Sequence, residues 1–443
     1  RGTYTQLAPA VFILPYFLFS SIAGQFAERT EKSRLIRITT AMEIAIMSLA
    51  AVGFLLQDMV VLLVALFATG VQSTLFGPVK YSILPSVLKP EELTGGNGLV
   101  EKGTSIAGSL GMLFGGLIFT VAGPQHGPMA AAIAVILLAI AGNLLSRAIP
   151  SVPASAPDLK VQWNPIPESI AILKLARKQL AVRNSILGVS WFWFTGTVLT
   201  GNLPVYSETH LGGTPTLYVF ALAVFSIGVG VGSLLCEKLS ARTVEIGLVP
   251  LGAIGMSACI VHLALAPAIA AKGLDVAGFI AQPGSWRVVL DLAGIGLFSG
   301  FFVVPLFALI QSRSPREELS RVIAGMNIQN AIFIVAAALG GVALQQALGW
   351  SIPQVFMALG IASIVVAAWI FSIVPEFLMR FLSWLLVRGL YRLKLHGIEK
   401  NVPDEGAALL VCNHVSFMDA LVLAASTPRP VRFVMYYKIF NIP

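Results

Sequence analysis

The stretch Gly24-Gln-Phe-Ala-Glu28-Arg29-Thr-Glu-Lys32-Ser-Arg34 is short and strongly charged, and it lies between two long apolar runs, residues 7–26 and 37–56. Each run is long enough to cross about 30 Å of hydrocarbon as a helix. Short loops rich in Lys and Arg face the cytoplasm in membrane proteins. The stretch therefore predicts two membrane helices that are joined on the inner side.

The composition extends this prediction to the whole chain. Of the 443 residues, 56% are hydrophobic and 11% are charged, whereas soluble domains carry about 25% charged residues. Because hydrocarbon offers no hydrogen-bond partners, spanning segments must satisfy their backbone groups as helices. We therefore expect an all-α polytopic membrane protein. The net charge of +8 sits in short loops, which indicates membrane orientation and not a nucleic-acid partner.

Further apolar stretches of spanning length follow the first two. Basic residues gather in every second connection, and the alternate connections hold only Lys272, with Arg287 just beyond. This alternation places the C-terminal segment inside and Arg1 outside, so the number of spans is odd. We therefore expect one more helix upstream of Arg1. The eleven stretches are 7–26, 37–56, 59–79, 99–122, 127–148, 184–206, 216–236, 244–268, 287–310, 322–346 and 350–374.

Twelve spans would form two six-helix halves, the arrangement expected of facilitator-type transporters with internal repeats. A polar, proline-rich stretch divides the halves after the sixth span. The expected organisation is an N-terminal half without its first helix (1–148), a cytoplasmic linker (149–180), a C-terminal half (181–375), an amphipathic membrane-surface helix and linker (376–400), and the N-terminal fragment of a further domain (401–443).

The opening stretch resembles the G-x-x-x-D-R-x-G-R-K signature of the major facilitator superfamily, with Glu28 for Asp and Glu31 for Gly. By this resemblance Gly24 allows close helix approach and Glu28 lies near a helix end, while Arg29 and Lys32 anchor at the inner headgroups. These four residues are candidates for gating or structural roles. The alternative interpretation is an ordinary basic loop.

Two longer strings are more specific. Gly77-Pro-Val-Lys80-Tyr-Ser-Ile-Leu precedes Asn97-Gly-Leu-Val-Glu101, and Phe301-Phe-Val-Val-Pro-Leu-Phe-Ala-Leu-Ile-Gln311 precedes Asn327-Ile-Gln-Asn330. They resemble the lysophospholipid transporter family, whose members carry P-A-K-Y-G-I-L, N-G-L-x-E and F-x-V-P-L-N-A-L-x-Q in this order. The resemblance covers residues 7–375. It departs at Val79, Ser82 and Phe307, where the family has Ala, Gly and Asn.

The resemblance implies a lysophospholipid substrate, such as lysophosphatidylethanolamine, moved from the outer to the inner leaflet. A phosphate headgroup requires a cation and amide donors. The candidate substrate-binding residues are Lys80, Asn97, Glu101, Gln311, Asn327, Gln329 and Asn330. Three interpretations of Lys80 stay open: phosphate contact, pairing with Glu101, and snorkelling to the inner interface. Glu43 either joins a gating ion pair or faces a wet cavity.

The C-terminal region combines two patterns. Residues 376–395 alternate apolar and basic residues at helical spacing, which predicts an amphipathic helix on the inner leaflet. Residues 406–412 read as a short buried strand that ends in Asn413-His414-Val-Ser-Phe-Met-Asp419, which resembles the N-H-x-S-x-x-D block of glycerolipid acyltransferases. The resemblance implies that His414 acts as general base and that Asp419 fixes its tautomer. We expect Asp419 one turn or more into the following helix.

The resemblance further implies an acyl donor carried by acyl carrier protein or coenzyme A, with a downstream acyl-activating domain as a further partner. The segment 401–443 is too short to enclose both substrates, so we expect it to be inactive as an enzyme by itself. The cysteines Cys236, Cys259 and Cys412 are widely spaced. We therefore predict no metal site and no cofactor within this chain.

The expected protein is a multi-pass transporter of a bacterial inner membrane with a cytoplasmic acyltransferase segment that reacylates the transported lipid. Two rival functions stay open at this point. One is a facilitator-type exporter of drugs or metabolites, which would have a small polar cavity closed to the bilayer. The other is a membrane scaffold for the acyltransferase, in which the polar residues of the helices play no part in lipid uptake.

Overall fold

The computed structural model describes residues 2–239, 247–373, 375–391, 393–394, 396–397, 402, 407–416, 418–427 and 431–434. Within these ranges the chain is almost entirely helical, in keeping with the all-α prediction. The helices are α1 (Gly2–Arg29), α2 (Lys32–Leu56), α3 (Met59–Ser82), α4 (Leu84–Val87), α5 (Leu93–Ser146), α6 (Pro165–Ala176), α7 (Leu180–Thr209), α8 (Pro215–Leu239), α9 (Leu248–Ala264), α10 (Val276–Ile280), α11 (Ser285–Arg313), α12 (Leu319–Val342), α13 (Ile352–Ile373), α14 (Pro375–Leu390) and α16 (Met418–Ser426).

Each predicted apolar stretch contains a helix, with ends that differ by a few residues; the start of 244–268 lies outside the described residues, and its end, 265–268, follows the last residue of α9. Two of the stretches fall in α5, whose helical path is broken at Gly123. Gly123 has φ 71°, a left-handed conformation that favours glycine. Eight helices of the described part are long and apolar enough to cross a membrane. The protein is therefore membrane-spanning.

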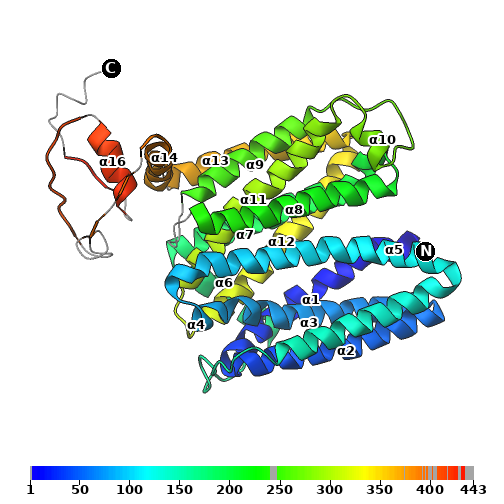
Figure 1. Ribbon diagram of the computed structural model, residues 1–443. Helices are drawn as coiled ribbons and strands as arrows, with labels where there is room; N and C mark the ends of the chain where they lie inside the picture. The colour runs from blue at the N-terminus through cyan, green and yellow to red at the C-terminus, as the bar shows by residue number, and fades with distance from the viewer. Residues whose placement is uncertain are drawn as a thin grey trace.

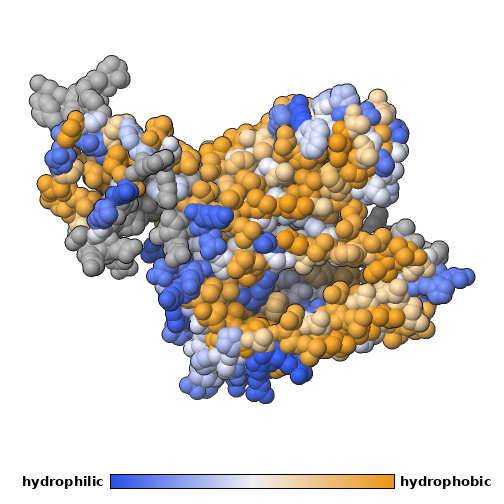
Figure 2. All heavy atoms as spheres, viewed as in Figure 1, coloured by the Kyte–Doolittle hydropathy of each residue, from blue (hydrophilic) through white to orange (hydrophobic). Residues whose placement is uncertain are grey.

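The helices form two bundles (Figure 1). One contains α1, α2, α3 and α5, and the other contains α7, α8, α9, α11, α12 and α13. The bundles meet where α1 and α3 pack on α12 and where α5 packs on α8 and α11. Figure 2 shows apolar side chains along both bundles and hydrophilic ones at their ends, with a hollow between the bundles on the side away from α14. The contact between the halves therefore lies toward the α14 end.

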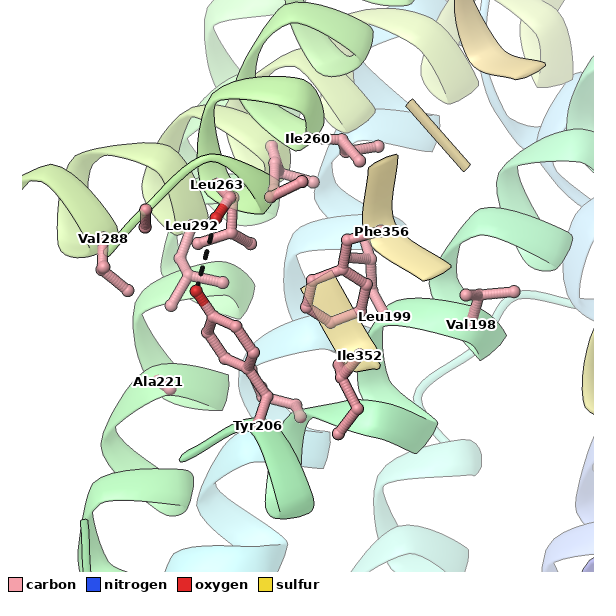
Figure 3. Packing of buried hydrophobic residues seen from close by; sticks show 14 of the residues in the cluster. Val198, Leu199, Tyr206, Ala221, Ile260, Leu263, Val288, Leu292, Ile352 and Phe356 are labelled. Carbon is pink, nitrogen blue, oxygen red and sulfur yellow. Dashed lines mark hydrogen bonds between the residues drawn. The ribbon is translucent and has the colours of Figure 1, made fainter. Parts of the chain in front are cut away.

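The described residues of the second bundle form two buried apolar clusters, and one of them surrounds Tyr206 (Figure 3). This side chain is fully buried, and its hydroxyl donates to the carbonyl oxygen of Leu263 at 3.4 Å. Phe356 of α13 packs against the Tyr206 ring with 5.2 Å between centroids. The tyrosine thus joins α7, α9 and α13 through one buried aromatic group whose polar end is satisfied.

Glycines set the closest helix crossing, between α8 and α11. A Cβ atom added at Gly232 would lie 2.1 Å from the Leu297 carbonyl oxygen, and one added at Gly228 would lie 2.4 Å from that of Ala293. Small residues let helix backbones approach in this way, and van der Waals packing is the main attraction between helices in lipid. These glycines therefore serve packing inside one half of the molecule.

We expect Gly232→Leu to destabilise the second bundle, because the added side chain must push α11 away from α8. Overpacking of this kind costs about 1–3 kcal/mol. Thermal unfolding of the detergent-solubilised protein should show a lowered Tm. Gly142→Leu is the matched control, since no atom lies within 4 Å of a Cβ at that position. An equal Tm for both variants would contradict the proposed role of the crossing.

Candidate functional site

A buried carboxylate joins the two halves. Glu28, at the end of α1, has no exposed surface and accepts hydrogen bonds from the backbone N–H of Arg321 at 3.0 Å and from its Nε at 2.6 Å. Arg321 lies in the first turn of α12, where the helix dipole also favours a negative charge. Gly24, one turn earlier on α1, lies against Ala324 of α12. The first basic loop therefore ends in a contact between the halves.

Lys32 lies in the same contact. Its side chain is buried, and Nζ donates to Ser82 Oγ at 3.0 Å and to Ser320 Oγ at 3.2 Å. The Ser320 hydroxyl donates to the Ser82 hydroxyl at 3.0 Å. The prediction that Lys32 anchors at the headgroups is therefore wrong, because buried hydroxyls of both halves solvate its ammonium. Arg29 is exposed, as an anchor would be.

We call Glu28, Lys32, Ser82, Ser320 and Arg321 the inter-half contact. Ser82 supplies a hydroxyl where the resembled family has glycine, so this chain makes a bond that glycine could not make. Because a buried charge is expensive without a partner, these bonds stabilise Glu28 and Lys32 where they lie.

The linker between the halves is fastened to the first basic loop. Glu31 Oε1 accepts from Ser33 Oγ at 2.6 Å and from Ser151 Oγ at 2.7 Å. These two hydroxyl donors lower the pKa of Glu31 below its usual value. The backbone N–H of Lys32 donates to the Val152 carbonyl at 3.0 Å. Glu31, which replaces a glycine of the signature, therefore holds the start of the linker.

The linker stays attached further along. The N–H of Ala156 donates to the carbonyl of Glu28 at 3.0 Å, and the Gln25 side-chain amide exchanges two hydrogen bonds with the backbone of Gln162. Helix α6 then packs against α12 and α1. The linker thus runs along the inter-half contact from one half to the other.

Lys80 and Glu101 lie near the inter-half contact without pairing directly. Although both are described, no ion pair joins them: Lys80 Nζ donates to Thr104 Oγ1 at 3.0 Å and lies 5.0 Å from the Tyr81 ring centroid. Glu101 is buried and accepts from the Tyr81 hydroxyl at 2.7 Å. Of the interpretations left open for Lys80, a direct pair with Glu101 is therefore not the arrangement present.

The side-chain amides of Asn97 and Gln311, two further candidates, are hydrogen-bonded to each other. Asn97 Nδ2 donates to Gln311 Oε1 at 2.6 Å, and Gln311 Nε2 donates to Asn97 Oδ1 at 3.0 Å and to the Tyr81 carbonyl at 3.1 Å. Phe307, where the resembled family has Asn, stacks on the Tyr81 ring with 4.5 Å between centroids and 6° between planes. These bonds and this stack join α3 and α5 of one half to α11 of the other.

The remaining candidates have other contacts. Asn327 lies opposite Gly77 of α3. Gln329 accepts from Arg177 at 3.4 Å, and Asn330 accepts from the Ser190 hydroxyl at 2.8 Å. Glu43 is half-buried on α2 and has no ion-pair partner among the residues that the structure describes. The structure therefore brings together Lys80, Asn97, Glu101 and Gln311, with Asn327 against α3 one turn before Lys80, whereas Gln329, Asn330 and Glu43 have other neighbours.

In the sequence, Ser82 and Phe307 stand out as departures from the family, but no role was predicted for them, nor for Tyr81, Ser320 or Arg321. Tyr81 and Ser82 lie directly after Lys80 in the stretch 77–84 that resembles the family. Their position in this stretch was the signal that could have identified them. Arg321 resembles any other basic residue of a loop, because its partner Glu28 is 293 positions away in sequence.

The C-terminal motif forms a compact turn. Asp419 Oδ2 accepts from His414 Nδ1 at 3.0 Å and from the backbone N–H groups of Val415 at 2.7 Å and Ser416 at 2.8 Å. The two backbone N–H donors, with His414, lower the pKa of Asp419 below 3.8. With a carboxylate acceptor at Nδ1, the proton sits there, and Nε2 is left to act as a base. The His414 side chain is 75% exposed.

Two details of this motif differ from the sequence prediction. Asp419 is the second residue of α16 and therefore lies in its first turn, not deeper. Residues 407–412 are exposed and form no strand, whereas a short buried strand was predicted; Gly406 and Phe417 lie outside the described residues. A strand requires a neighbour for its backbone groups, and among the described residues this segment has none.

We expect the turn at 413–419 to depend on the Asp419 carboxylate. Asp419→Asn should raise hydrogen exchange at the Val415 and Ser416 amides in mass-spectrometric measurements. In the parent chain the lowered pKa keeps the carboxylate charged above pH 4. Protection, corrected for intrinsic exchange, should therefore persist from pH 7 to pH 5 and be lost as the pH falls through that pKa. Loss of protection near pH 6 would contradict this assignment.

Comparison with known proteins agrees with the fold and the motifs. Residues 2–327 match the Major Facilitator Superfamily model, and residues 392–443 match the Acyltransferase model. The chain is 30% identical over 316 residues to the lysophospholipid transporter LplT of Cronobacter sakazakii, covering 69% of this chain and 71% of that protein. It is 27% identical over 309 residues to LplT of Klebsiella pneumoniae, covering 68% and 70%.

Solved structures show the same fold. The human organic anion transporter MFSD10 aligns with a TM-score of 0.64 at 12% identity, over 82% of this chain and 83% of that chain. The E. coli fucose:proton symporter FucP aligns with a TM-score of 0.62 at 14% identity, over 83% and 90%. The chain belongs to the Major Facilitator Superfamily and, within it, to the lysophospholipid transporter family.

The inter-half contact gives a prediction of its own. We expect Glu28→Ala to part the halves at this end, because Arg321 loses both a charged and a backbone bond. Such bonds contribute about 1–3 kcal/mol, which corresponds to about 5–150-fold in the closed-to-open ratio. Spin labels at Ser86 and Arg316, which line one hollow between the halves, should report longer distances by pulsed electron resonance.

Glu91→Ala is the control for this measurement, because Glu91 is an exposed carboxylate on the first half. Ser82→Gly should give a smaller change in the same direction as Glu28→Ala. An unchanged distance distribution in Glu28→Ala would show that the contact does not hold the halves together.

Proposed function

We propose that the protein moves lysophospholipids of the lysophosphatidylethanolamine type from the outer to the inner leaflet of a bacterial inner membrane. The family of the chain and its similarity to the lysophospholipid transporters LplT support the substrate class. The alternation of basic loops supports an inner-side position for the C-terminal segment.

The observation that carries the proposal is the state of Lys80. Its ammonium has three donors, and the described contact uses one of them, on the neutral hydroxyl of Thr104. Glu101, the nearest carboxylate, is held by Tyr81 instead. Lys80 is therefore a half-buried cation without a directly bonded counter-ion, and a lipid phosphate would supply one.

Asn97 and Gln311 have a different role in this proposal. Their amides are bonded to each other across the two halves. We assign them to closing the α14 end of the molecule and not to headgroup contact. Their release would accompany the opening of this end, when a lipid received near Lys80 moves on.

We further propose that His414 and Asp419 belong to an acyltransferase that reacylates the delivered lipid. In that reaction His414 Nε2 takes the proton of the lysolipid hydroxyl as its oxygen attacks the carbonyl carbon of an acyl thioester, and the thiolate leaves. Acyl carrier protein or coenzyme A would carry the thioester. Proximity of delivery and reaction raises the effective concentration of the lysolipid.

Uptake of labelled lysophosphatidylethanolamine into proteoliposomes tests the transport proposal. Lys80→Ala should lower the initial rate about tenfold, since a charged hydrogen bond is worth about 1.5–3 kcal/mol, and Lys80→Arg should retain most of it. Lys174→Ala, at an exposed lysine of α6, should match the parent protein. Equal rates for Lys80→Ala and the parent would favour the membrane-scaffold function, and no uptake above protein-free vesicles would reject transport.

A further inference from the structure

Helix α14 follows α13 after a single residue and lies across its end. In Figure 1, α14 is seen end-on, whereas the long helices of the bundles are seen from the side. A helix that crosses the direction of the spans at their end lies in the plane of the membrane surface. The short joint to α13, whose residues Ile352–Ile370 form a candidate span, leaves α14 little distance to move away from that surface.

One side of α14 is occupied by protein. The helix packs against α16, with smaller contacts to α9 and α13. Ser383 and Val387, one turn apart, are buried, with exposed fractions of 6% and 1%. Helix α16 begins with the turn that carries Asp419 and His414. This side of α14 therefore holds the acyltransferase motif.

A second side of α14 is apolar and has no partner in the described part of the chain. Met379, Leu382, Leu386 and Leu390 have exposed fractions of 56%, 40%, 47% and 66%. Their spacing of three, four and four residues places them on one stripe of the helix. We call these four residues the α14 stripe.

The charge of the segment indicates what covers the α14 stripe. Residues 376–395 contain Arg380, Arg388, Arg392 and Lys394 but a single acidic residue, Glu376. An apolar stripe within a segment of net positive charge is the composition of helices that lie in the headgroup region of anionic leaflets. If water covered the α14 stripe, four large apolar side chains would be exposed to it. The bilayer that surrounds α13 lies directly beside α14 and can cover them instead.

We propose that the α14 stripe docks on the anionic phospholipid surface of the inner leaflet and thereby holds His414 and Asp419 at headgroup depth. The glycerol hydroxyl of a lysophospholipid lies at that same depth, so the acceptor needs no extraction from the bilayer. Docking itself depends on neither the transport nor the acyl transfer proposed above, and its test is separate from theirs.

Site-directed spin labelling of the full chain tests the docking. In a background with Cys236, Cys259 and Cys412 replaced by Ala, a label at Leu386→Cys is placed in proteoliposomes of phosphatidylethanolamine and phosphatidylglycerol. We expect collisions with oxygen to exceed those with a water-soluble nickel complex several-fold. In pure phosphatidylcholine that ratio should fall. A label at Val387→Cys, on the protein side, should be shielded from both reagents.

Other results would overturn the proposal. Ready nickel access at Leu386 in both lipid mixtures would mean that water covers the stripe, and shielding from both reagents would mean a protein partner, such as a second copy. Equal oxygen-to-nickel ratios in the two mixtures would overturn the role of anionic lipid. A second measurement places the label at Leu390→Cys. The double variant Leu382→Glu and Leu386→Glu should then raise nickel access at the label. The matched double variant Leu382→Met and Leu386→Met should leave nickel access unchanged.

Discussion

A carboxylate that is cut off from water must be compensated where it lies, and this constraint organises the region where the two halves meet. Glu28 is compensated by the first turn of α12 and by Arg321, both from the opposite half. Lys32, equally buried, is solvated by serines of α3 and α12. Separating the halves would strand both charges unless water enters at once. The closed end is thus held by polar groups that have their partners only when the halves touch.

Three consecutive residues of α3 connect this closed end to the proposed headgroup site. Lys80 reaches Thr104 on α5, Tyr81 reaches Glu101 and Phe307, and Ser82 reaches Lys32 and Ser320. Because the three share one helical turn, a movement of α3 at any one of them displaces the other two. In the proposed transport, arrival of a phosphate at Lys80 would therefore be coupled to release of the inter-half contact through α3.

The fold followed from the sequence to a much greater extent than the site did. Apolar runs are local signals, and lipid enforces helices wherever such runs occur. Glu28, Asn97 and Tyr81 each contact a residue more than 200 positions away in sequence. Ser82 and Phe307 also take part in these contacts, and both differ from the residue that the resembled family has at that position. No local pattern encodes such pairs. The motif at 413–419 was predictable as a contact because its five-residue spacing is local, whereas the predicted strand before it depended on neighbours beyond its own sequence.

The connection between the halves has a consequence for the speed of the conformational cycle. From Ser151 to Gln162 the linker is bonded to the first half, and α6 then packs on the second. A linker that is hydrogen-bonded at several positions is not a flexible tether. Parting of the halves therefore requires these hydrogen bonds to break one after another. Substitutions in the linker would then change the rate of the conformational cycle without any change to the residues of the proposed lipid site.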